Sequence, residues 1–149
     1  MLNIYTDGSC LGNPGTGGWA ALAVQSSPSD LILKICGGDL STTNNRMELR
    51  AAIEGLEKAL EFTKNAKIFT DSNYVKDGIT KWIKNWEKNN WKTASGSPVK
   101  NQELWKKLLK VSQRFLILEW EWVKAHNGDP NNEAVDTLAK KAAELLIKK

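Results

Sequence analysis

The first third of the chain alternates hydrophobic and polar residues in the manner of β-strands. Three short runs of high strand propensity occupy residues 2–6, 19–24 and 31–36. We expect the glycine-rich residues 12–18 to form a wide hairpin loop, and the polar residues 26–30 to form a turn. Because such short connections join antiparallel neighbours, this region is predicted to be an antiparallel meander.

From residue 45 onward the hydrophobic period changes to that of helices. Leu49, Ile53, Leu56 and Leu60 recur at intervals of four, three and four, which is typical of an amphipathic helix. Three further helical stretches and two strands follow, and the expected strands cover residues 67–70 and 115–123. The helical stretches carry the apolar positions Val75, Ile79, Trp82 and Trp86, then Leu104, Leu108 and Val111, then Val135, Leu138, Ala142 and Leu145.

This order of elements predicts an α/β fold. Two strand–helix–strand crossovers follow the meander, and such crossovers join parallel strands. We therefore expect a mixed five-stranded sheet, with three antiparallel strands and then two parallel ones, and with helices on both faces. Residues 1–149 are expected to form a single domain. A chain of 149 residues with 41% hydrophobic residues can bury one hydrophobic core.

Composition indicates the cellular compartment in which the protein is expected to work. No apolar stretch approaches the roughly 20 residues of a membrane span, so no membrane partner is expected. The cysteines, Cys10 and Cys36, do not make a disulfide framework, and no signal-peptide pattern opens the chain. We expect a reduced, cytoplasmic protein, monomeric in the absence of a heptad pattern, with Cys36 in the core of its strand.

Positive charge is concentrated in one segment. The net charge of the chain is only +4, but residues 76–110 contain nine lysines against three acids, a net charge of +6. Four of the seven tryptophans lie there too, at Trp82, Trp86, Trp91 and Trp105. Lysines interleaved with aromatic residues are typical of a surface that binds a nucleic-acid backbone. A solvated helix face combined with ordinary tryptophan packing would produce the same pattern.

Four acidic residues stand where this fold could bring them together. Asp7 and Asp71 each follow a strand, and neighbouring parallel strands would place both at the carboxyl edge of the sheet, where such sheets bind ligands. Glu48 begins a helix face of small residues, and Asp136 lies two turns into the last helix. Structural alternatives are an Asp7–Gly8 turn, an Asp71 helix cap, an Asn45–Glu48 capping box and an Asp136–Lys140 ion pair.

Clustered carboxylates suit a particular chemistry. Mg²⁺ prefers oxygen ligands, and two such ions can hold an attacking water and a leaving oxygen in line across one phosphorus. Zinc is poorly supported, because one histidine and two distant cysteines do not provide its usual ligands. His126 lies in a loop before the helix of Asp136, where an imidazole could shuttle a proton, with Glu133 as a weaker helper. Alternatively, His126 is an ordinary exposed loop residue.

Five blocks of sequence resemble, in order, those of bacterial type 1 ribonuclease H (ribonuclease HI). The blocks are TDGSCLGNPGTGGWA at 6–20, TTNNRMEL at 42–49, TDSNYVKDGITKWIKNW at 70–86, WKTASGSPVKNQELW at 91–105 and WVKAHNGDPNNEAVDTLA at 122–139. The resemblance implies a ribonuclease H fold whose basic helical protrusion covers about residues 76–110. It also implies an endonuclease that hydrolyses the RNA strand of RNA–DNA hybrids, leaving 5′-phosphate and 3′-hydroxyl ends.

The resemblance also implies roles for individual residues. Asp7, Glu48, Asp71 and Asp136 match the family's metal-binding acids, which hold two Mg²⁺ ions with substrate bound and accept Mn²⁺ as a substitute, and His126 matches the loop histidine. The substrate-binding positions are Cys10, Gly12, Asn13, Asn44 and Asn45 on the minor groove, Thr43, Trp82, Trp86 and Asn101 on the DNA strand, Asn73 beside the acids, and the protrusion lysines Lys84, Lys88 and Lys92.

Three residues depart from the family pattern. Ser41 replaces a frequent arginine, Asn73 a frequent glutamine, and Ala125 the usual glycine. None of these departures removes a catalytic acid. Two other classes of function remain open at this point: a hybrid-binding module without catalysis, and a DNA nuclease or integrase on the same fold.

Overall fold

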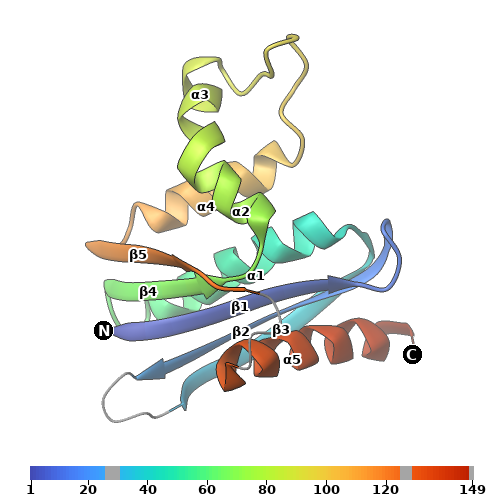
Figure 1. The fold of residues 1–149 in the computed structure, drawn as a ribbon, viewed down its shortest axis with the longest axis vertical. Coiled ribbons are helices and arrows are strands. Elements are labelled where there is room, and N and C mark those ends of the chain that lie inside the picture. The colour runs from blue at the N-terminus through green and yellow to red at the C-terminus, as the bar shows by residue number, and fades with distance from the viewer. Residues whose placement is uncertain (26–30, 125–128, 148–149) are drawn as a thin grey trace.

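The structure is a computed structural model that describes residues 1–25, 31–124 and 129–147. It contains a five-stranded sheet and helices (Figure 1). The elements in chain order are β1 (Leu2–Cys10), β2 (Gly15–Gln25), β3 (Leu31–Thr42), α1 (Asn44–Ala59), β4 (Asn65–Thr70), α2 (Asn73–Asp77), the π-helical turn η1 (Gly78–Trp82), α3 (Ile83–Lys88), α4 (Gln102–Ser112), β5 (Ile117–Trp122) and α5 (Pro130–Ile147). None of the described helices is long and apolar enough to cross a membrane.

The sheet confirms the predicted topology. Its strand order is β3-β2-β1-β4-β5, with antiparallel pairs among the first three strands and parallel pairs between β1 and β4 and between β4 and β5. The parallel register of β1 and β4 pairs Tyr5 with Phe69. Both strands therefore end at the same edge of the sheet, as parallel neighbours must.

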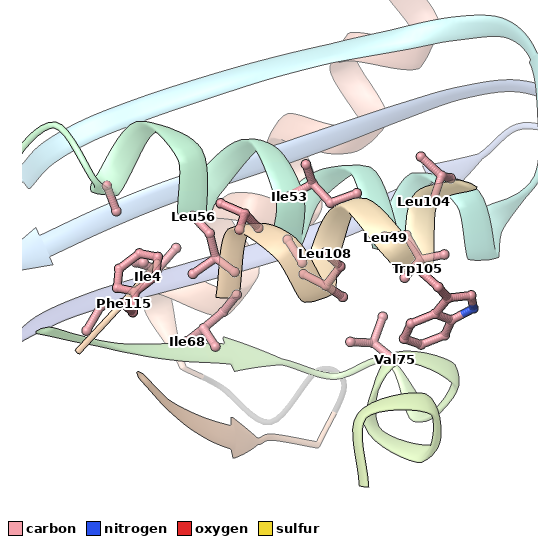
Figure 2. Packing of buried hydrophobic residues seen from close by; sticks show 14 of the residues in the cluster. Ile4, Leu49, Ile53, Leu56, Ile68, Val75, Leu104, Trp105, Leu108 and Phe115 are labelled. Carbon is pink, nitrogen blue, oxygen red and sulfur yellow. The ribbon is translucent and has the colours of Figure 1, made fainter. Parts of the chain in front are cut away.

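Helices cover both faces of the sheet. α1 packs on β1 and β2 and is covered in turn by α4, whereas α5 packs on β1, β2 and β3 from the opposite side (Figure 1). Figure 2 shows the larger core, in which apolar side chains of α1 and α4 meet those of the sheet. The side chains labelled there are Ile4, Leu49, Ile53, Leu56, Ile68, Val75, Leu104, Trp105, Leu108 and Phe115.

The α2, η1 and α3 segments rise from the sheet together and, with the chain that leads to α4, form the part that stands out in Figure 1. A run of aromatic rings holds this part together: the centroid of the Trp86 ring lies 5.7 Å from that of Trp82, 6.0 Å from Trp91 and 5.4 Å from Trp105. Trp105 is fully buried. Much of the tryptophan pattern therefore serves packing, as one of the two interpretations expected.

Several local predictions were wrong. Residues 12–18 are not a wide loop, because β2 begins at Gly15 and α5 packs so closely on it that a Cβ at Gly18 would lie 2.7 Å from the backbone nitrogen of Ala143. Cys36 is exposed, since β3 is an edge strand. Leu145 is also exposed, and Ala139 and Ala143 are buried on α5 instead.

Candidate active site

Asp7 and Asp71 meet at the carboxyl edge of the sheet, as predicted. The residues pair in parallel as far as Tyr5 and Phe69, and each aspartate lies two residues beyond that pair. Asp7 is not in a turn: β1 continues to Cys10, and Asp7 pairs with Ala20 of β2. Asp71 does not cap the next helix either, because the Ser72 hydroxyl accepts that hydrogen bond from the backbone N–H of Val75 at 3.1 Å.

Glu48 approaches the same edge from α1. The helix begins after Thr43, whose hydroxyl accepts a hydrogen bond from the Arg46 N–H at 3.3 Å, so the expected Asn45–Glu48 capping box is not formed. The small residues Ala52, Gly55 and Ala59, which share a face with Glu48, are buried against the sheet. They allow α1 to lie close to the strands, and the Glu48 carboxylate is thereby directed at the ends of the strands.

The three carboxylates form one compact cluster, in which Asp7 and Glu48 are buried and Asp71 is half-buried. One oxygen each from Asp7, Glu48 and Asp71 lies within 4.8 Å of the other two. Burial raises the pKa of Asp7 to about 8, and the charge of Asp71 and a hydrogen bond with Asp136 add to that rise. Burial likewise raises the pKa of Glu48 well above its ordinary value, with the charges of Asp7 and Asp71 as further causes. The cluster thus disfavours its own negative charge.

The donor set fits a hard divalent cation. Mg²⁺ and similar ions take carboxylate oxygens as ligands, and the charge of such an ion removes the cost of gathering acids. Among the described residues, the buried Glu48 Oε1 finds no hydrogen-bond partner, which is costly unless an ion or water meets it. Asp7, Glu48 and Asp71 are therefore the residues that would hold such an ion.

Asp136 lies at the border of this cluster. It forms a hydrogen bond with Asp7 and raises that residue's pKa, which places its side chain beside the three acids. It also forms the expected ion pair with Lys140, at 3.1 Å between Nζ and Oδ2. The Asp136–Lys140 ion pair is therefore formed, while Asp136 also lies next to Asp7.

The two auxiliary residues have different outcomes. His126 and the departure at Ala125 lie outside the described residues. Glu133 is exposed on the first turn of α5 and lines a cavity of about 350 Å³ with Lys34 and Lys141. It does not belong to the group of three carboxylates described above.

Several of the predicted minor-groove residues lie where the β1–β2 connection meets the end of β3 and the start of α1. The Cys10 thiol packs against the carbonyl oxygens of Gly12, Gly15 and Thr42. The Asn13 side chain accepts a hydrogen bond from the Asn44 N–H at 3.2 Å, which ties the β1–β2 loop to the start of α1. Asn45, next along, is exposed. Cys10, Gly12, Asn13, Asn44 and Asn45 thus offer uncharged hydrogen-bond donors and acceptors, and we call the surface that they form the polar ledge.

The protruding part carries a groove of its own. Trp82, Trp86 and Lys92 line a cavity of about 470 Å³ there. Lys84 and Lys88 are exposed on α3 but do not line that cavity. The three predicted lysines are therefore not equivalent.

Sequence reasoning missed a tie between this part and α1. The guanidinium of Arg46 donates to Asn101 Oδ1 at 3.0 Å and forms an ion pair with Glu103 at 2.9 Å. Asn101 also donates to the Tyr74 hydroxyl at 3.1 Å. These contacts link Asn101 through Arg46 to Thr43. No signal in the local sequence indicated the tie, because its partners are 55 and 57 residues apart.

Two departures from the family pattern are visible. Ser41 is exposed at the end of β3, and its N–H donates to the Asp39 carboxylate at 3.1 Å. Asn73 is exposed at the first position of α2 and lines a cavity beside Asp71. Neither change disturbs the three carboxylates.

Comparisons with known proteins identify the family. The RNase H family model matches residues 1–144. Ribonuclease HI of Xylella fastidiosa is 55% identical over 141 residues, which cover 94% of this chain and 90% of that protein.

Solved structures agree with this sequence match. The crystal structure of LC9-RNase H1, a type 1 RNase H with the type 2 active-site motif, is 34% identical, with a TM-score of 0.83, over 96% of this chain and 72% of that one. LC11-RNase H1, solved in complex with an RNA/DNA hybrid, shares the fold at 19% identity, with a TM-score of 0.76 and 99% of each chain covered. This chain therefore belongs to the RNase H family.

Proposed function

We propose that the chain is a metal-dependent endonuclease that hydrolyses the RNA strand of RNA–DNA hybrids and leaves 5′-phosphate and 3′-hydroxyl ends. The observation that carries the proposal is the compact cluster of Asp7, Glu48 and Asp71 at the edge of the sheet. Family membership supports the reaction, and the hybrid bound by the similar LC11 enzyme supports the substrate. The basic segment fits a polyanionic partner of this kind.

The metal is proposed to be Mg²⁺, two ions per site with substrate bound, with Mn²⁺ as a possible substitute. Bound there, such ions supply a nucleophilic water near neutral pH and neutralise charge on the leaving oxygen. Asp7, Glu48 and Asp71 hold the metal site, and Asp136 completes it from α5. The close spacing of the three acids would keep the metal site, and with it the reacting phosphate, in one position.

Other residues of the chain hold the substrate. The ledge of Cys10, Gly12, Asn13, Asn44 and Asn45 faces the minor groove, where the 2′-hydroxyl distinguishes RNA from DNA. The DNA strand is held by Thr43 and Asn101, by the groove of Trp82, Trp86 and Lys92, and by Lys84 and Lys88. Phosphate contacts of this kind position a duplex without reading its sequence. Asn73 acts beside the acids.

His126 is proposed to move a proton at the leaving 3′ oxygen, with Glu133 as a minor helper. An imidazole suits this work because its ordinary pKa of about 6.5 lies close to neutral pH. We further propose that the chain acts as a monomer in the cytoplasm, as its composition and free thiols favour. Sedimentation of the purified protein tests the monomer.

The two alternative functions are less favoured. A binding module without catalysis has no use for buried carboxylates facing phosphates, since they repel a polyanion unless cations intervene. A DNA nuclease or integrase on the same fold would not need the polar ledge, because DNA has no 2′-hydroxyl for the ledge to recognise. Neither alternative agrees as well with the named relatives.

One assay tests the proposal. A hybrid labelled on its RNA strand is incubated with the protein and Mg²⁺, with and without a chelator, beside the same sequence as double-stranded DNA. We expect chelator-sensitive cleavage of the RNA strand only. Retention of the hybrid without cleavage would favour the binding module, and cleavage of the DNA duplex alone would favour the second nuclease class.

A further inference from the structure

A separate cavity opens beside Asp71. Its volume is about 190 Å³, and it lies where the ends of β4 and β5 meet the start of α2. Its lining includes Asp71, Asn73, Lys76, Trp122 and Lys124. Asp71 thus belongs to the carboxylate cluster and also borders this cavity.

Two lysines give the cavity its charge. Lys76 comes from α2, and Lys124 follows the end of β5 by two residues. Among the residues that the structure describes, neither ammonium group has an ion-pair partner, whereas nearby Lys81 pairs with Asp77 at 3.5 Å and Lys67 with Glu121 at 3.9 Å. Two lysines from different elements therefore face one cavity with their charges available to an anion.

The cavity is distinct from the groove of the protruding part. That groove is lined by Trp82, Trp86 and Lys92, and the two sets of lining residues do not overlap. The DNA strand is already assigned to that groove. The cavity beside Asp71 is a second cationic site, and it adjoins the carboxylate cluster. It therefore suits a phosphate other than those of the DNA strand.

We propose that Lys76 and Lys124 bind a backbone phosphate of the RNA strand, one or two nucleotides from the phosphate that is cut. This inference rests on the proposed function. An RNA strand whose scissile phosphate lies at Asp71 carries further phosphates on either side of it. Because Asp71 also lines the cavity, the phosphates on one side would pass over the cavity. The ammonium groups neutralise that phosphate, the Asn73 amide donates to it, and the Trp122 ring contacts the adjoining ribose.

The subsite would fix the orientation of the RNA strand at the carboxylate cluster. A single phosphate held only at the carboxylates can rotate about that point, whereas a second contact on the same strand fixes its direction. Fixing the direction keeps the attacking water, the phosphorus and the leaving oxygen in line. The subsite is therefore expected to act mainly on binding of the RNA strand in its reactive position.

The first test measures the Michaelis constant against salt. The Lys76→Gln/Lys124→Gln protein is compared with wild type from about 50 to 200 mM salt, where the slope of log affinity against log salt counts phosphate contacts. We expect KM to rise more than kcat falls, and the salt slope to shrink by about one. Lys58→Gln/Lys64→Gln, which removes the same charge from exposed side chains outside the basic segment, is expected to keep the wild-type slope.

A second test locates the phosphate. Single uncharged methylphosphonate linkages are placed along either strand of the hybrid, with a 2′-O-methyl ribose protecting each one in RNA. In wild type, one linkage in the RNA strand close to the cut should weaken cleavage, and the lysine variant should lose that sensitivity while retaining sensitivity to changes in the DNA strand.

The outcomes separate the two levels of the proposal. Wild-type cleavage with an unchanged salt slope in the variant overturns the subsite alone, as does a loss of sensitivity that falls on the DNA strand. A wild-type protein that cleaves no hybrid overturns both the subsite and the proposed function.

Discussion

Gly8 of β1 lies directly against the backbone of Glu48 in α1. A Cβ at Gly8 would overlap the Glu48 amide nitrogen and would lie 2.6 Å from the carbonyl carbon of Met47. The missing side chain lets the first turn of α1 approach the strand that carries Asp7. The separation of two proposed metal ligands is thus set by an adjacent glycine.

Replacing that glycine tests the relationship. We expect Gly8→Ala to destabilise the protein by about 1–3 kcal/mol, because backbone rather than a flexible side chain must move. It should also lower hybrid cleavage, since α1 carries Glu48 away from Asp7. Chemical denaturation and single-turnover cleavage measure the two effects. Ser9→Ala, the next position on β1, serves as the control, and a Gly8→Ala protein with wild-type stability and rate would contradict the argument.

Asp71→Asn should abolish metal-dependent cleavage while leaving the fold intact. The change removes a charge from the proposed metal site but almost no volume. A metal contributes several kcal/mol to such a reaction, so a loss of about 10³-fold in kcat is expected. Asp77→Asn is the matched control, because Asp77 only pairs with Lys81 on α2 and η1. Unimpaired cleavage by Asp71→Asn, with Mg²⁺ dependence retained, would remove Asp71 from the mechanism.

Stability without divalent metal should fall as pH rises from about 4 to 8. The pKa of Asp7 is raised to about 8 in the folded state, and that of Glu48 is raised as well. Between the unfolded and folded values the native state holds more protons than the unfolded chain, so the free energy of unfolding decreases as pH increases. The contribution of Asp7 is complete below pH 4 and is lost above pH 8, and Glu48 changes stability in the same direction.

Thermal unfolding in chelator at pH 5 and pH 8.5 measures this dependence. Each kcal/mol corresponds to a shift of about 3 °C in Tm for a chain of this size. Asp7→Asn should flatten the dependence and raise Tm at pH 8.5, whereas Glu57→Gln, an exposed change on α1, should do neither. Added Mg²⁺ should stabilise wild type most at high pH. A wild-type Tm that rises between these pH values in chelator would show that other groups dominate.

The protrusion lysines should differ in their effect on substrate binding. Lys92 lines the groove with Trp82 and Trp86, whereas Lys84 and Lys88 do not. We expect Lys92→Gln to raise KM and to reduce the salt slope by about one, with smaller effects from Lys84→Gln and Lys88→Gln. Kinetics at several salt concentrations provide the comparison. Equal, negligible effects from all three substitutions would favour the solvated-face interpretation.

The periodicity of the sequence predicted the elements well where packing followed a single repeat. The meander, the crossovers and the first helix are confirmed, because hydrophobic residues at a regular spacing define the buried face directly. Predictions failed where a second element changed the burial of a residue. Gly17 and Gly18 lie within β2, with Gly18 against α5, and Leu145 lies on the exposed side of α5.

The candidate site shows the same division. The rule that parallel strands end at one edge was enough to bring Asp7 and Asp71 together, and the small residues of α1 indicated the direction of Glu48. Capping was harder to predict, because several neighbouring residues could accept the same hydrogen bond. Thr43 caps α1 and Ser72 caps α2, so Glu48 and Asp71 do not serve as caps and belong to the carboxylate cluster instead.

The sequence by itself determined the order of the elements, the acids at their ends and the position of the basic segment. These properties depend on local periodicity, chain connectivity and charge, which a linear sequence contains in full. The tertiary structure alone decided how close the acids lie, that Arg46 ties α1 to Asn101 and Glu103, and that Lys76 and Lys124 share a cavity with Asp71. Such relationships depend on side chains from distant segments meeting in the packed chain, where burial also sets the pKa of Asp7.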